Sequence, residues 1–234
     1  MKLTLVKKVS EAKDTKSFFW EPEKKVSWLP GQYFYFTLPK LKYPDRRGAT
    51  RHFTIASSPT ENGLLRLTTR IREESGYKKT LDEIKTGESI EGEGPTGTFI
   101  LDEKAVQSSS SQDVQVFLAG GIGITPFRAF IKYNLDKNLN IPMYLIYSNS
   151  NSEFVYGDEM KKLFNKNVSF YDSSKSGHLE KEWIKSFINH KSLIINHLCF
   201  WVSGPPSFVN AMEDILEELK VDSSAVHSDK FTGY

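Results

Sequence analysis

The feature that most constrains the fold is a change of pattern on either side of a serine run at residues 108–111. Before it, short strand-like segments are separated by Gly, Pro and Asn turns, which indicates a small antiparallel barrel or sandwich. After it, apolar strands alternate with amphipathic helices, which indicates parallel βα units. We therefore expect two domains, residues 1–107 and 112–234. A hairpin loop inside a single domain would also explain the serines.

The expected fold class is thus an N-terminal antiparallel β-barrel followed by a C-terminal parallel α/β domain. In the first half we expect strands at 3–9, 32–38, 51–55 and 64–71 and a helix at 78–84. In the second half we expect strands at 114–119, 143–147, 168–171 and 199–202, and helices at 126–135, 159–164, 179–188 and 208–219. The strand at 114–119 is a continuous apolar run, as in a sheet covered on both faces.

Composition excludes several classes of protein. A net charge of +2 gives no reason to expect nucleic acid or an anionic membrane as partner. The single cysteine, Cys199, permits no intrachain disulfide and is too few for a cluster that needs about four thiolates. The five histidines have no metal-ligand spacing. No apolar run approaches the roughly 20 residues of a membrane span and no signal peptide is evident, so the cytoplasm is the expected location.

A glycine-rich turn at 119–127 directly follows the buried strand and precedes a helix. Gly121 and Gly123 allow the backbone to lie close to a ligand, and the helix start beside Thr125 offers free N–H groups to a phosphate. Pro126 suits a first helical turn but stands where the usual dinucleotide motif has a third glycine. A second turn, at 203–207, also ends a parallel strand, where open α/β sheets bind ligands. Both turns could instead be plain packing solutions.

A third segment, residues 51–59, combines three kinds of chemistry on one strand. Arg51 suits a phosphate because its guanidinium binds two oxygens. Phe53, on the same face, can lie on a flat ring, and the hydroxyl of Thr54 can make one hydrogen bond. An ordinary exposed barrel strand is the alternative interpretation.

Together with a Gly-Pro-Thr-Gly-Thr-Phe segment at 94–99, these motifs resemble the ferredoxin–NADP⁺ reductase family over almost the whole chain. The resemblance implies an FAD-binding barrel and a domain that binds NADH or NADPH. It implies that Arg51 holds the flavin phosphate, Phe53 packs on the isoalloxazine and Thr54 bonds near its N5. The other cofactor-binding residues that it implies are Gly76, Tyr77 and Lys78 for the diphosphate, Gly121, Gly123 and Thr125 for the pyridine nucleotide, and Ser203, Gly204 and Pro205 beside the nicotinamide.

The last residues resemble the family's aromatic tail, which shields the flavin until the nicotinamide displaces it. Phe231 is the first choice for that ring and Tyr234 the second, and a disordered tail is the alternative. With Thr54 and Ser203, Phe231 completes the expected catalytic set.

The sequence departs from the family pattern in two places. Many members have Cys where this chain has Ser203, which leaves the rate of hydride transfer in question. The segment 147–153 has no Lys or Arg and one acid, Glu153, where many members bind the 2′-phosphate of NADPH, and this favours NADH modestly.

The resemblance implies an enzyme that moves a hydride between NAD(P)H and FAD, then passes electrons to ferredoxin, flavodoxin, a partner oxygenase or a small oxidant. Two alternatives stay open. One is an electron-transfer subunit that is active only with a partner, and the other is a non-catalytic module that senses flavin or nucleotide redox state.

Overall fold

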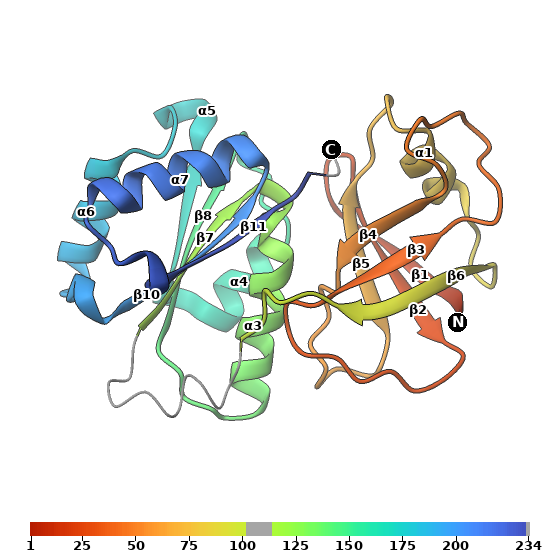
Figure 1. The fold of residues 1–234 in the computed structure, drawn as a ribbon, viewed down its shortest axis with the longest axis horizontal. Helices are drawn as coiled ribbons and strands as arrows, with labels where there is room; N and C mark the ends of the chain where they lie inside the picture. The colour runs from red at the N-terminus through yellow and green to blue at the C-terminus, as the bar shows by residue number, and fades with distance from the viewer. Residues whose placement is uncertain (102–113, 233–234) are drawn as a thin grey trace.

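The computed structural model describes residues 1–101 and 114–232, which form an antiparallel and a parallel β-sheet lying side by side (Figure 1). The serine run, the expected boundary between residues 107 and 112, and Tyr234 lie outside the described residues. The expected fold class, antiparallel strands followed by a parallel α/β domain, is confirmed.

The first sheet is a six-stranded antiparallel sheet in the order β4-β3-β6-β1-β2-β5. Just after β4, the N–H of Ala56 donates to the carbonyl of Arg66 in β5 at 2.8 Å, so the two outer strands meet and the sheet curls into a barrel. The strands are β1 (Lys2–Ala12), β2 (Thr15–Pro22), β3 (Tyr33–Thr37), β4 (Thr50–Thr54), β5 (Leu65–Arg70) and β6 (Ser89–Thr96). Four of them were expected, whereas β2 and β6 were not.

Helix α1 (Gly76–Glu83) connects β5 to β6 and begins two residues before the expected start. The hydroxyl of Ser75 caps it by accepting a hydrogen bond from the N–H of Lys78 at 3.3 Å. Tyr77 and Leu81 turn inward and join a barrel core of aromatic and aliphatic side chains. The start of α1 is thereby fixed against the barrel.

The second sheet has five parallel strands in the order β11-β10-β7-β8-β9. The chain runs outward from β7 to β9 and then crosses to β10 on the other side of β7. The carboxyl ends of β7 and β10 therefore flank a topological switch point, where such sheets bind ligands. The strands are β7 (Val114–Gly120), β8 (Met143–Asn149), β9 (Val168–Asp172), β10 (Leu198–Gly204) and β11 (Val226–Lys230).

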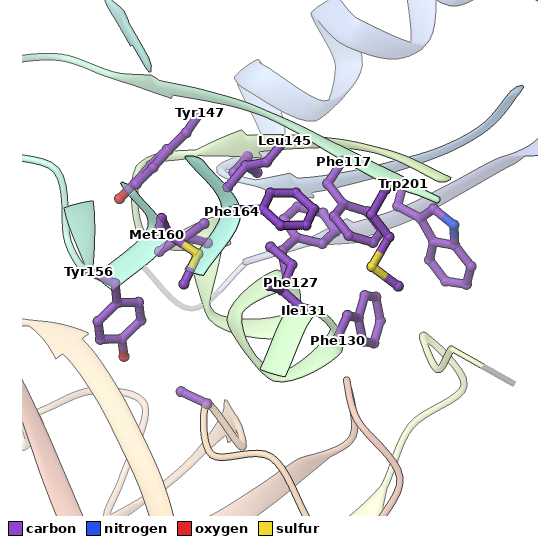
Figure 2. Packing of buried hydrophobic residues seen from close by; sticks show 14 of the residues in the cluster. Phe117, Phe127, Phe130, Ile131, Leu145, Tyr147, Tyr156, Met160, Phe164 and Trp201 are labelled. Atoms are coloured by element: carbon purple, nitrogen blue, oxygen red, sulfur yellow. The ribbon is translucent and has the colours of Figure 1, made fainter. Parts of the chain in front are cut away.

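Helices cover both faces of this sheet, as the apolar strand at its centre predicts. Alternate residues of β7 enter two cores: Phe117 packs toward α3 and α4 (Figure 2), and Val116 toward α6 and α7. The helices are α3 (Ile124–Asp136), α4 (Gly157–Phe164), α5 (Ser173–Ser176), α6 (Lys181–His190) and α7 (Pro206–Glu218). Short 3-10 turns lie at Gly121–Gly123, Asn165–Asn167, Ile195–His197 and Ser223–Ala225. The four helices expected in this half are confirmed; β11 was not expected.

The layer formed by α3 and α4 lies between the parallel sheet and the barrel (Figure 1). From α3, the buried guanidinium of Arg128 donates to the carbonyl of Ala56 at 2.8 Å and to the carboxylate of Glu61 at 2.9 and 3.0 Å. It also binds Glu159 of α4 at 2.6 and 2.9 Å. Beside it, the hydroxyl of Tyr156 bonds to Thr68 of the barrel. These contacts fix the barrel against the second domain and so shape the cleft between them.

Candidate functional site

A cleft between the two sheets brings together side chains from widely separated parts of the chain. Six of the expected site residues line it: Arg51, Phe53, Thr54, Lys78, Thr125 and Phe231. Five further residues line it that the sequence did not point out: Tyr33, Arg47, His52, Thr68 and Asp229. The motifs at 51–59 and 119–127 therefore meet at one place, as their resemblance to a two-domain family implies.

On β4, Arg51 and Phe53 share a face, as their alternation predicts, and both pack on Tyr77 of α1. The guanidinium of Arg51 lies 5.1 Å from the centre of the Tyr77 ring, and the ring centres of Phe53 and Tyr77 are 6.1 Å apart. Tyr77 itself is fully buried, and its hydroxyl donates to the carbonyl of Phe36 at 2.9 Å. Burial raises the pKa of Tyr77, and the charge of Arg51 only partly opposes this. The Tyr77 side chain thus supports the site, and only its backbone N–H can face an anion.

Positive charge gathers at the start of α1. Burial, together with the charges of Arg72, Arg51 and Arg47 and against the opposing effect of Glu74, lowers the pKa of Lys78 to about 8. Mutual repulsion among neighbouring cations is expected where a site is built for an anion of more than one charge. The carboxylate of Asp45 lies among these groups, 2.5 Å from the Arg51 guanidinium.

Near the end of β11, Asp229 and Phe231 line the same cleft as Thr54. The N–H of Phe231 donates to the carbonyl of Gly204 at 2.9 Å, which ties the last residues to the turn after β10. Burial raises the pKa of Asp229 to about 6. A carboxylate and an aromatic ring therefore border the part of the cleft that lies nearest to the second domain.

A second pocket opens at the carboxyl ends of β7, β8 and β10. Gly121 and Pro205 line it, as expected, together with the polar residues Ser148, Asn149, Ser150, Ser173 and His178. Arg70 and Arg72, at the end of β5 in the barrel, line it too. Glu153, the acid that favoured NADH, lies elsewhere: its carboxylate accepts the N–H of Lys13 at 2.8 Å and borders a different pocket.

The two turns that carry the glycine motifs touch each other. A Cβ added to Gly123 would lie 2.1 Å from the carbonyl oxygen of Ser203, and one added to Gly204 would lie 2.9 Å from that of Gly120. Gly123 therefore permits the close approach of the turns, whereas Gly121 lines the pocket itself. Ser203 is fully buried, and its hydroxyl has no hydrogen-bond partner among the residues that the structure describes.

The residues of the cleft fit a flavin. Aromatic rings from the barrel and from the C-terminal segment suit a flat ring system, the Thr54 hydroxyl suits its polar edge, and the cations around α1 suit its phosphates. The second pocket, with hydroxyl and amide groups facing two arginines, fits the ribose and phosphates of a nucleotide. Among residues 1–101 and 114–232, no group of three or more His, Cys, Asp or Glu side chains is placed to hold a metal ion.

Comparison with known proteins finds two domain families in succession along the chain. Residues 2–100 match the oxidoreductase FAD-binding domain and residues 117–214 match the oxidoreductase NAD-binding domain. These matches define an oxidoreductase that binds FAD and a pyridine nucleotide. The chain belongs to the family of flavoprotein reductases built like ferredoxin–NADP⁺ reductase.

Relatives are distant in sequence. The chain is 25% identical over 231 residues to flavohemoprotein A of Dictyostelium discoideum, covering 91% of this chain and 55% of that protein. It is 24% identical over 239 residues to the glycine betaine monooxygenase reductase subunit of Pseudomonas aeruginosa, covering 97% and 63%. The chain thus spans 55–63% of the length of these curated relatives.

Two solved structures share the fold. The Amycolatopsis cytochrome P450 reductase GcoB superimposes with a TM-score of 0.78 at 18% identity, over 99% of this chain and 70% of that one. Ferredoxin–NADP⁺ reductase from Plasmodium falciparum superimposes with a TM-score of 0.74 at 20% identity, over 98% and 95%. None of the helices within the described ranges is long and apolar enough to cross a membrane.

Proposed function

We propose that this chain takes a hydride from NADH or NADPH into FAD held in the cleft and passes the electrons to an acceptor protein or small oxidant. The observation that carries the proposal is the convergence of Arg51, Thr54 and Phe231 with Thr125 of the second domain on one cleft. FAD, when bound, supplies the hydride acceptor and the exit for single electrons. A reductase subunit of an oxygenase among the relatives supports an acceptor protein as partner.

Each residue in the cleft has a proposed role. Arg51 and Lys78 bind the flavin phosphates, Phe53 packs on the ring system, and Thr54 donates a hydrogen bond to its polar edge. At the start of α1, Tyr77 would contribute its backbone N–H alone. Phe231 covers the ring face until the nicotinamide arrives. Tyr234, the second choice for that ring, lies outside the described residues.

The nucleotide is proposed to lie across the second pocket, with its nicotinamide reaching Thr125 and the turn at Ser203, Gly204 and Pro205. Gly121 would let the diphosphate approach the backbone, and Gly123 would hold the two turns together. We add Arg70 and Arg72 as phosphate ligands from the barrel, because they line the same pocket. The proposed domains remain residues 1–107 for FAD and 112–234 for the nucleotide.

The choice between NADH and NADPH depends on this pocket. The sequence favoured NADH modestly because residues 147–153 contain no Lys or Arg and one acid, Glu153, but the Glu153 carboxylate accepts a hydrogen bond from the N–H of Lys13 instead. With two arginines and no acid among the residues that line this pocket, a 2′-phosphate is tolerated better than the sequence indicated. The donor preference is therefore a quantity to measure.

The decisive experiment is the visible spectrum of the purified protein, followed by anaerobic addition of NADH or NADPH. We expect flavin bands that bleach, faster with the preferred nucleotide. Flavin bands that never bleach would show that the protein binds flavin without accepting a hydride, as a binding module would. A protein that takes up no FAD would overturn the proposal.

A matched pair of variants tests the phosphate site. Arg51→Ala should weaken FAD retention about tenfold or more, because it removes a buried charge-assisted ligand. Arg46→Ala, an exposed arginine of the same loop, should leave retention unchanged. Equal flavin content in the two variants would count against the role of Arg51.

A further inference from the structure

The carboxylate of Asp45 is bound by the donors that a flavin diphosphate would use. Its Oδ1 accepts from the Arg51 guanidinium at 2.5 Å and from the N–H of Arg47 at 3.0 Å. Its Oδ2 accepts from the N–H of Tyr77, in the first turn of α1, at 2.9 Å, and from the Ser75 hydroxyl at 3.2 Å. The side chains of Asp45 and Arg51 are both only 8% exposed. The Asp45 carboxylate thus links the Arg51 guanidinium to the first turn of α1.

The backbone of the same loop also covers the helix start. A Cβ added to Gly76 would lie 2.2 Å from the carbonyl oxygen of Pro44 and 2.5 Å from that of Tyr43. Carbonyl oxygens repel phosphate, so a diphosphate cannot lie on this side of Gly76 while the loop stays there. Contact between the diphosphate and this side of Gly76 therefore requires the loop to move.

One carboxylate does not neutralise this site. Although burial alone would raise the pKa of Asp45, bonds from the Tyr77 and Arg47 amides and the charge of Arg51 hold it below its usual value, so Asp45 is ionised at neutral pH. Its single negative charge pairs with Arg51, while the charges of Arg47, Arg51 and Arg72 all act on Lys78, with Glu74 as the acid of that group. A diphosphate, with more charge than a carboxylate, suits these four cations better.

The tip of the loop lies at the surface. Arg46, Arg47 and Gly48 are exposed, and no heavy atom lies within 4 Å of a Cβ added to Gly48. The Arg51 guanidinium holds the end of the loop by donating to the carbonyls of Arg47, Gly48 and Thr50 at 2.7–3.0 Å. A ligand that recruits Arg51 therefore competes with these bonds as well as with Asp45.

We propose that Asp45 competes internally with the flavin phosphate: its carboxylate occupies donors that the phosphate requires and must withdraw with its loop before FAD binds. This inference rests on the proposed function. While Asp45 holds these donors, the site binds no diphosphate. The observed FAD affinity is therefore the intrinsic affinity multiplied by the fraction of molecules in which the loop has withdrawn. Asp45 thereby sets how tightly the protein retains its flavin.

The test compares Asp45→Asn with Asp82→Asn in the full chain, freed of flavin and shown to be folded by far-UV circular dichroism. Asparagine keeps the shape of Asp45 and an oxygen for the Tyr77 N–H but loses the charge. Asp82 lies on the same helix and pairs with Lys16 at 2.7 Å, away from the helix start. Dissociation constants for FAD and for riboflavin, which has no phosphate, are measured by flavin fluorescence at fixed ionic strength.

We expect Asp45→Asn to tighten FAD binding about tenfold, as removal of a competing anion from an arginine and a helix start implies, and to leave riboflavin binding unchanged. The flavin-free variant should melt at a lower temperature than the parent, and saturating FAD should remove the difference. Asp82→Asn should change neither dissociation constant.

Weaker FAD binding by Asp45→Asn would overturn the proposal and make Asp45 a positioning residue for Arg51 in the flavin-bound protein. Unchanged FAD binding, or equal tightening for riboflavin, would also overturn it, while leaving the flavin function intact. If neither the parent nor Asp45→Asn binds FAD, the flavin assignment itself fails and this proposal with it.

Discussion

Asp229 is a cleft residue whose acidity is strongly altered by its surroundings. It enters the cleft beside Phe231, and its pKa is raised to about 6 by burial. The neighbouring cation does not neutralise it, because Lys230 pairs with Glu213 at 2.7 Å instead. A carboxylate near the nicotinamide would stabilise the positive charge that develops on that ring as hydride leaves.

We therefore expect the rate of flavin reduction by NAD(P)H to fall as pH drops through about 6, where Asp229 takes up a proton. Asp229→Asn should lack this inflection and reduce flavin about tenfold more slowly at about pH 8. Stopped-flow absorbance of the flavin bands measures both. An unaltered pH profile in the variant would exclude Asp229 as the titrating group.

The ionised Asp229 carboxylate should also lower the free energy of unfolding. Its pKa is higher in the folded than in the unfolded protein, so its unfavourable contribution is absent below about pH 4 and complete above about pH 6. Asp229→Asn should therefore unfold in urea with a free energy about 2 kcal/mol higher than the parent at about pH 8, with the gain disappearing toward about pH 4. A gain that is the same at both pH values would point to packing instead.

Among single residues, the sequence could predict which motif residues line the cleft, but it could not predict the residues that lie beside them. Arg51, Thr54 and Thr125 belong to segments whose order along the chain carries information, and all three line the cleft. Asp45 and Asp229 lie in segments without a motif, and only the folded chain brings them to Arg51 and Thr54. No local signal in the sequence separates them from exposed acids.

Among elements, the pair of turns after β7 and β10 offers the sharpest test. A Cβ added to Gly123 would lie so close to the Ser203 carbonyl that even a methyl group must push the turns apart. Gly123→Ala should lower the free energy of unfolding by about 2 kcal/mol, as overpacking does. It should weaken NAD(P)H binding about tenfold or more and affect FAD less, because the proposed phosphate ligands Arg51 and Lys78 lie on β4 and α1 and not on the turns.

Gly157→Ala is the matched control for Gly123→Ala. Gly157 begins α4, and the nearest heavy atom to an added Cβ is the Cβ of Phe154 at 3.2 Å, a tight contact that requires only a small shift of Phe154. We expect its nucleotide affinity, measured by isothermal titration, to match that of the parent protein. If Gly123→Ala binds nucleotide as well as this control, the close approach of the turns is not required for the site.

The sequence did not predict strands β6 and β11, and each has a physical reason. Strand β6 contains Gly92, Gly94 and Pro95, which favour turns, yet Gly92 is needed there because a Cβ would lie 2.4 Å from Leu3. Strand β11 is a short polar edge strand with one partner. The long helices α3 and α7, by contrast, were predicted within two residues, because their apolar periodicity is independent of neighbours.

At the scale of the molecule, function requires that FAD and nucleotide meet, so the two domains must keep one orientation. Arg128 of α3 is the centre of the contact that fixes it, since it binds Ala56 and Glu61 of the barrel and Glu159 of α4. Its side chain is 4% exposed, whereas the two carboxylate side chains are 25–30% exposed. Without Arg128, the two carboxylates would face each other across the junction.

Arg128→Met should therefore lower the free energy of unfolding in urea by about 3 kcal/mol, as removal of one member of a buried ion-pair network does. Lys132→Met is the control: Lys132 lies one turn along α3, pairs with Asp136 within its own helix and should cost about 0.5 kcal/mol or less. Because misplacement of the reacting rings slows hydride transfer more than it weakens either ligand, Arg128→Met should keep its affinities for FAD and NAD(P)H while flavin reduction slows about tenfold. A variant that loses stability but reduces flavin at the parent rate would show that the junction stabilises the chain without setting the geometry of transfer.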